Sequence, residues 1–288
     1  MERTGNFFMS FLFALAFLLS SQNGLASEVW PFEKAEAFPL KEVRLLPSPF
    51  KKAMEIDQRY LLSLDPNRLL WPFYERAGLP TKGDRYGGWE RLDCVGHILG
   101  HYLSACSLMY AGGADGEIKK RIDYIVSEIA RVQKKHGNGY AGPVRTEVWK
   151  EAFSGKFRVR AWGLGGGYVP WYVVHKTFAG LLDAYVNAEN KLALRVACES
   201  AEWAKRETDK LNDAQFQRML RCEHGGMLDV LVRLYALTGK KDFLDLARRF
   251  DHKAIFDPLA QERDVLTGKH ANTLIPKIIG ACLFYKKT

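Results

Sequence analysis

A repeated pair of helix patterns constrains this chain more than any other feature of its sequence. Apolar segments that run from a histidine to a tyrosine occur at 101–110, 175–185 and 224–235. A short turn follows each tyrosine, and a charged segment with apolar residues at helical spacing comes next, at 117–135, 191–209 and 241–252. The pattern predicts an all-α array of helical hairpins, with an apolar inner helix and an amphipathic outer helix in each. The repeat lacks the tetratricopeptide signature, so we expect the hairpins to close into a barrel rather than an open solenoid.

A fourth unit begins at His270, and the sequence stops three residues after its tyrosine, Tyr285. Its inner helix has no outer partner in the sequence. An uncovered apolar face would lose burial worth about 1.5–3 kcal/mol for each large side chain. We therefore expect either that another chain covers this face, as in a homodimer through 276–285, or that the sequence is incomplete.

The first residues have the layout of an export signal. Residues 7–19 carry no charge, follow Arg3 and lead into Gly24-Leu25-Ala26. This stretch is too short for a stable membrane anchor, so we expect cleavage after Ala26 and a secreted or periplasmic protein. Residues 1–26 are then the signal peptide, residues 27–48 an extended lead-in with three prolines, and residues 49–288 the helical domain.

Four histidines lie at the beginnings of the predicted inner helices: His101, His175, His224 and His270. Inner helices that all run in one direction place their first residues at the same end of the array. We expect these imidazoles to line one polar pocket and to bind the hydroxyl groups of a neutral substrate. The alternative is that each is a buried histidine with a satisfied hydrogen bond.

The insertion 136–175 is rich in glycine and aromatic residues, and loops of this length in a compact domain are usually functional. Its aromatic side chains could stack on the apolar faces of sugar rings or simply pack beneath the loop. They are Tyr140, Trp162, Tyr168, Trp171 and Tyr172.

Other chemistries have less support. The glycines at 163–167 do not form a nucleotide-binding fingerprint, and no GxSxG motif indicates an esterase. Cys94, His97 and His101 could hold a metal on one helix face, but the same spacing suits a buried face. The five cysteines fall mostly within apolar helical patterns, which favours buried thiols over a disulfide framework. The net charge of +9 is interspersed, so no basic stripe suggests a nucleic-acid partner. The candidate carboxylates near the pocket are Glu90, Asp93, Glu147 and Glu223.

Five motifs in order resemble the amino-terminal half of a known enzyme family. They are GGWERLDCVGHILGHYLSACSLMYA (87–111), NGY (138–140), VPWYVVHKTFAGLLDAY (169–185), EHGGMLDVLVRLYALTGKKDFLDLARRF (223–250) and KHANTLIPKIIG (269–280). The sequence resembles the β-L-arabinofuranosidases, glycoside hydrolase family 127 and its relatives. The resemblance implies an (α/α)6 barrel, in which His175, His224 and His270 line an arabinofuranose pocket, with His101 as a further member.

The resemblance also implies what this sequence lacks. In that family the acid/base glutamate follows the HANT motif, as do a Glu-x-Cys pair and a Cys-Cys pair that hold zinc. This sequence contains neither pair. No catalytic residue, metal site or cofactor is therefore carried over, and zinc belongs to the complete enzyme. We expect a partial (α/α)6 barrel, truncated before the catalytic carboxy-terminal half, of an enzyme that hydrolyses terminal arabinofuranosides of plant-type glycans when complete. This chain supplies part of the sugar pocket and is expected to be inactive alone. A non-catalytic carbohydrate-binding protein and a helical scaffold for a protein partner are the alternatives.

Overall fold

The structure is a computed structural model that describes residues 37–91, 94–114 and 116–288. The predicted signal peptide, residues 1–26, and the first part of the lead-in lie outside these residues. The chain divides into two units, residues 1–43 and residues 44–288. In the described part of the first unit, Leu40–Glu42 form a single 3-10 turn. The site described below lies entirely within the second unit.

The second unit is built mainly from α-helices, as predicted. Its inner helices are α4 (His97–Ala111), α7 (Pro170–Ala188), α10 (Met227–Thr238) and α13 (Ala271–Lys287). Its outer helices are α5 (Gly116–His136), α8 (Lys191–Thr208) and α11 (Lys241–Arg249). The remaining helices are α2 (Pro49–Ser63), α3 (Pro66–Arg76), α6 (Thr146–Ala152), α9 (Asp213–Met219) and α12 (Lys253–Ala260).

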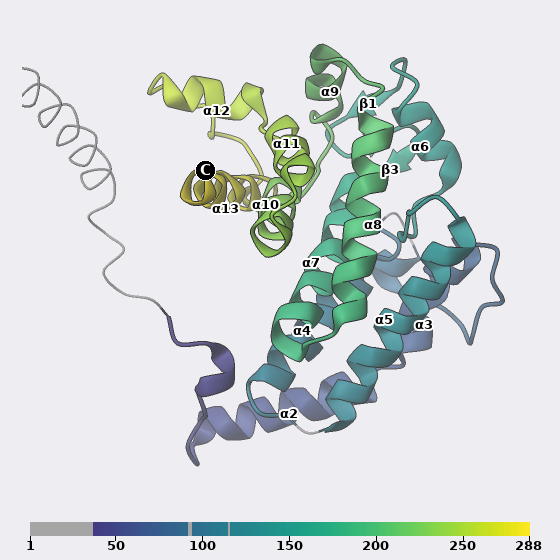
Figure 1. The fold of residues 1–288 in the computed structure, drawn as a ribbon, viewed down its shortest axis with the longest axis vertical. Coiled ribbons are helices and arrows are strands. Elements are labelled where there is room, and N and C mark those ends of the chain that lie inside the picture. The colour runs from purple at the N-terminus through teal and green to yellow at the C-terminus, as the bar shows by residue number, and fades with distance from the viewer. Residues whose placement is uncertain (1–36, 92–93, 115) are drawn as a thin grey trace, which may run out of the picture. The chain divides into compact units, whose positions relative to one another are not determined.

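Consecutive helices of each layer are neighbours. Helix α4 packs on α7, α7 on α10 and α10 on α13, while α5 packs on α8 and α8 on α11 (Figure 1). Each outer helix also packs on the inner helix that precedes it. This arrangement of inner and outer layers is that of part of an all-α barrel of hairpins.

Glycine sets the close approach of α4 to α7. A β-carbon at Gly100 would lie 2.1 Å from the backbone oxygen of Lys176, and one at Gly180 would lie 2.7 Å from the backbone oxygen of Gly100. Neither position can hold a larger residue unless the helices separate. The contact fixes the position of α4 along the axis of α7. It therefore determines which residues of the two helices lie at the same end of the array.

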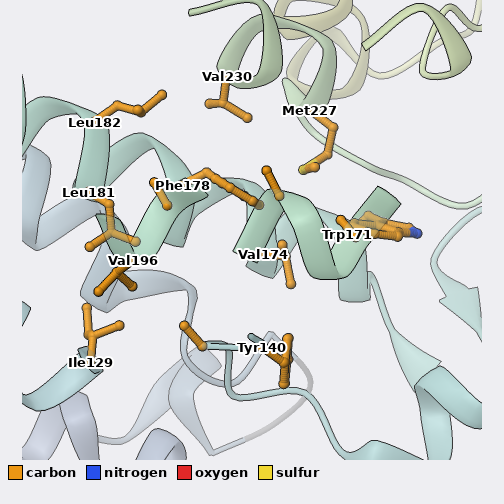
Figure 2. Close-up of a cluster of buried hydrophobic side chains, with 14 of the residues drawn as sticks. Ile129, Tyr140, Trp171, Val174, Phe178, Leu181, Leu182, Val196, Met227 and Val230 are labelled. Atoms are coloured by element: carbon orange, nitrogen blue, oxygen red, sulfur yellow. The ribbon is translucent and has the colours of Figure 1, made fainter. Parts of the chain in front are cut away.

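The core lies between the two layers and is centred on α7. Figure 2 shows Trp171, Val174 and Phe178 from α7 among apolar side chains of neighbouring elements. On the outer side, α5 contributes a stripe at helical spacing. Its fully buried apolar members are Ile118, Ile122, Ile125, Val126, Ile129 and Val132. Hydrophobic burial between layers therefore holds the array together.

The insertion 136–175 is not a plain loop. It contains α6 and a small antiparallel sheet of β1 (Val159–Arg160), β2 (Gly163–Leu164) and β3 (Gly167–Tyr168). Gly165 and Gly166 turn β2 back into β3, and both have positive φ, at 58° and 72°. The glycine run is thus a hairpin turn. It packs closely on α6, since a β-carbon at Gly167 would lie only 2.8 Å from the side chain of Val148.

The last helix keeps much of its apolar surface in solvent. Only Leu274, Lys277 and Gly280 are buried on α13, and they face α10. Ile275 and Ile279 remain 55% and 53% exposed. A homodimer through 276–285 stays a prediction. Within the described residues, no helix is both long and apolar enough to cross a membrane.

Candidate functional site

A pocket of about 350 Å³ opens where the first turns of three inner helices meet the turn before α10. His97 comes from the first turn of α4, Tyr172 from α7, Glu223 from the turn before α10, and Asn272 from α13. The other lining residues are Trp89, Cys94, Trp162, Tyr168, Val169 and His270. The inner helices therefore do present their starts to one common site.

The start of α4 is fixed by a buried carboxylate. Glu90 is 3% exposed and accepts hydrogen bonds from the backbone N–H groups of Gly96, at 2.8 Å, and Ile98, at 3.2 Å. Its Oε1 also lies 3.3 Å from His97 Nδ1. Carboxylates stabilise helix N-termini because the first N–H groups have no partners within the helix. His97 Nδ1 also lies 2.5 Å from the backbone oxygen of Cys94, so this oxygen and Glu90 together orient the ring at the pocket.

Glu223 and Lys277 form a buried ion pair that joins the turn before α10 to α13. Their side chains are 5% and 8% exposed, and Glu223 Oε2 lies 3.3 Å from Lys277 Nζ. Glu223 Oε1 accepts a hydrogen bond from the Gly225 N–H at 2.8 Å. Burial raises the pKa of Glu223 and lowers that of Lys277, whereas their mutual attraction opposes both shifts. The pair holds a carboxylate at the wall of the pocket.

The aromatic walls of the pocket are open to solvent. Trp89 and Trp162 are 57% and 41% exposed, which is unusual for the largest apolar side chain. The ring of Trp162 meets that of His270 edge-on, with centroids 5.9 Å apart. Burial raises the pKa of Tyr172, and a side-chain hydrogen bond with Asn272 opposes that shift. Exposed aromatic faces beside a few fixed polar groups are typical of ligand sites.

The four predicted histidines take different positions. His270 precedes α13 and lines the pocket. His101 lies one turn further along α4, is exposed, and has its ring centroid 6.0 Å from that of His97. His175 and His224 are buried and are not among the pocket's lining residues. Direct substrate contact by His101, His175 and His224 stays a prediction.

His175 packs on the double glycine of the EHGG motif. A β-carbon at Gly225 would lie 2.6 Å from His175 Nδ1, and one at Gly226 would lie 2.9 Å from Nε2. Burial lowers the pKa of His175 well below its usual value, so the ring is neutral at neutral pH. The ring therefore supports the turn that carries Glu223.

His224 lies behind the same turn. Its Nδ1 is 3.1 Å from the backbone oxygen of Cys222, and its ring centroid is 5.4 Å from that of His252. His224 Nε2 and His252 Nδ1 are buried without a hydrogen-bond partner among the described residues. Burial lowers the pKa of His224 well below its usual value and that of His252 to about 4.

Sequence reasoning missed three residues of the site: Trp89, Asn272 and Lys277. Each lies inside a quoted motif, GGWE, HANT or IPK, but nothing in the spacing marked it. The pattern identified the inner helices but not their first residues: α4 begins at His97, one turn before His101, and His97 is the residue that lines the pocket. Among the candidate carboxylates, Glu147 is exposed on α6, and Asp93 lies outside the described residues.

The residues present do not fit the zinc ion that the resemblance implies for the complete enzyme. Cys94, His97 and Glu223 line one pocket, but no three His, Cys, Asp or Glu side chains of the described residues are grouped to hold a metal. Two of these side chains already have other partners: His97 contacts Glu90, and Glu223 forms an ion pair with Lys277. No disulfide joins any of the five cysteines, which all lie in the described residues.

Comparison with known proteins places the chain in a family. None of the curated proteins matches this sequence. Among solved structures, a GH127 β-L-arabinofuranosidase from Geobacillus stearothermophilus T6 aligns with a TM-score of 0.46 and 14% identity, over 78% of this chain and 33% of that one. The chain thus spans about a third of the length of this solved structure. Residues 42–288 match the family described as "Beta-L-arabinofuranosidase, GH127 catalytic domain". The chain therefore belongs to the GH127 β-L-arabinofuranosidase catalytic-domain family.

Proposed function

We propose that the pocket at the helix starts binds a terminal arabinofuranose unit of a plant-type glycan. The observation that carries this proposal is the combination of exposed Trp89 and Trp162 with the fixed carboxylate of Glu223 in one 350 Å³ pocket. Membership of a glycoside hydrolase family supports a carbohydrate as the ligand.

The polar groups of the pocket suit hydroxyl ligands. An ionised Glu223 accepts hydrogen bonds, Asn272 both donates and accepts, and a neutral imidazole at His270 can do either. The tryptophan faces pack against the apolar face of a sugar ring and exclude water from these bonds. A neutral, hydroxyl-rich ring is the ligand that uses all of these groups.

Within this chain, we propose binding without turnover. Hydrolysis of a glycosidic bond most often uses two carboxyl groups on either side of that bond. Among the described residues that line the pocket, Glu223 is the only carboxylate. The sequence contains neither the Cys-Cys pair nor the Glu-x-Cys pair that, by the family resemblance, holds zinc in the complete enzyme.

Calorimetry with L-arabinose and an assay with an aryl β-L-arabinofuranoside test both parts of the proposal. We expect the 288-residue chain to bind L-arabinose, Trp162→Ala to weaken that binding, and neither protein to release the aryl group. Tyr60→Ala is the matched control, because Tyr60 is an exposed aromatic residue on α2 that does not line the pocket. Absence of L-arabinose binding would contradict the sugar site, and turnover would contradict binding without hydrolysis.

A further inference from the structure

A second pocket of about 450 Å³ adjoins the first. Trp162 and Tyr168 line both pockets, so the β-hairpin that carries them forms a shared wall. The remaining lining includes residues of α6 and the segment before it, with Gly166 and Gly167 on the hairpin side. A volume of this size is within the range of small-molecule sites. A ligand longer than one sugar ring could therefore occupy both pockets.

The two pockets differ in charge. Every charged residue that lines the second pocket is an arginine, Arg76 or Arg145, whereas the first contains the carboxylate of Glu223. Arg76 pairs with its neighbour Glu75, with Nη1 2.8 Å from Oε2. Arg145 is exposed, and among the described residues it makes no ion pair. Arg145 therefore presents a guanidinium group available to a ligand.

We infer that the second pocket is a subsite for a sugar that carries a carboxylate, such as a hexuronate, next to the neutral unit in the first pocket. A guanidinium group binds a carboxylate through two parallel hydrogen bonds, which an uncharged sugar cannot provide. The exposed face of Trp162 lies between the two positions and can contact either ring. This inference extends the proposed function from one neutral sugar to an acidic glycan.

The test compares D-galacturonate with D-galactose, which differ by the carboxylate at C6. In nuclear magnetic resonance titrations, we expect the intact chain to bind galacturonate about tenfold more tightly than galactose, as a charge-assisted hydrogen-bond pair implies. Arg145→Gln should remove this preference, and Arg145→Lys should retain part of it because the charge remains without the planar fork. Arg195→Gln, on the exposed side of α8, is the matched control and should keep the full preference.

Other outcomes separate this inference from the proposed function. Equal affinities for the two sugars, or an unchanged preference in Arg145→Gln, would overturn the acidic subsite. Displacement of galacturonate by an equal concentration of inorganic phosphate would also overturn it, because any small anion would then suffice. Binding of L-arabinose without a galacturonate preference would leave the first pocket as proposed. A galacturonate preference that Arg145→Gln removes, without L-arabinose binding, would support the acidic subsite and reject the arabinose site.

Discussion

At the residue scale, the arrangement of the site depends on buried polar groups that hold one another. Glu223 lines the pocket and Glu90 lies behind it against His97, and the partners of these two carboxylates differ. Glu90 accepts hydrogen bonds from backbone N–H groups at the start of α4, whereas Glu223 has one oxygen on the backbone and the other on Lys277. A buried charge that loses its partner is costly, so each partner has a measurable effect.

Replacement of Lys277 by methionine should destabilise the protein by about 3–5 kcal/mol at neutral pH, because Glu223 would remain buried and charged without its partner. Urea denaturation measures the free energy of unfolding. The double variant Lys277→Met with Glu223→Gln should recover part of this loss, since no charge then remains.

The loss of stability in Lys277→Met should also be smaller at acidic pH. Without Lys277 the folded-state pKa of Glu223 rises further, so protonation below its unfolded pKa removes the penalty. A loss independent of pH would contradict the ion-pair explanation.

The buried histidines should make the protein sensitive to acid. Burial lowers the pKa of His252 from 6.5 to about 4, so this ring is neutral in the folded state. A lowered folded-state pKa gives stability that is present above the unfolded pKa and is lost as the pH falls. We expect unfolding free energy to fall between about pH 6.5 and 4, by about 3 kcal/mol from His252 alone. Urea titrations across this range should show a shallower slope for His252→Gln, and an equal slope would contradict the prediction.

At the element scale, close helix contacts determine which side chains share the site. Gly100 lets α4 approach the backbone of α7, and Gly280 lets α13 approach α10, where a β-carbon would lie 2.9 Å from the Asp229 nitrogen. The turn of the EHGG motif also depends on glycine, because side chains at Gly225 and Gly226 would collide with the ring of His175. These close contacts align the first turns of the inner helices, and the pocket forms between the aligned turns.

Replacement of Gly100 by alanine should destabilise the protein by about 1–3 kcal/mol. The added methyl group would lie against the backbone oxygen of Lys176, which cannot move without separating α4 from α7. Thermal denaturation measures the change. Gly116→Ala in α5 is the control, because nothing lies within 4 Å of its β-carbon position and alanine favours helix there. Similar melting temperatures for Gly100→Ala and the parent chain would show that the contact is not a constraint.

At the scale of the whole molecule, the sequence predicted the helical hairpins and their order. The histidine-to-tyrosine repeats correspond to inner helices α4, α7 and α10, and the charged segments correspond to α5, α8 and α11. The apolar period is a local property that each helix expresses in its own sequence, so it could be recognised without a structure. The short β-sheet in the insertion could not, because strands of two residues have no period to detect.

The site was predicted only in part. The motifs of the sequence were enough to show that polar and aromatic residues lie near the starts of the inner helices and that the chain resembles a family of glycoside hydrolases. Which of these residues face the pocket follows from the packing of the helices against one another. A rotation or shift of one turn exchanges His97 for His101, and that choice depends on the glycine contacts between distant segments. The pairing of Glu223 with Lys277 likewise joins residues that lie 54 positions apart, and no local pattern encodes such a contact.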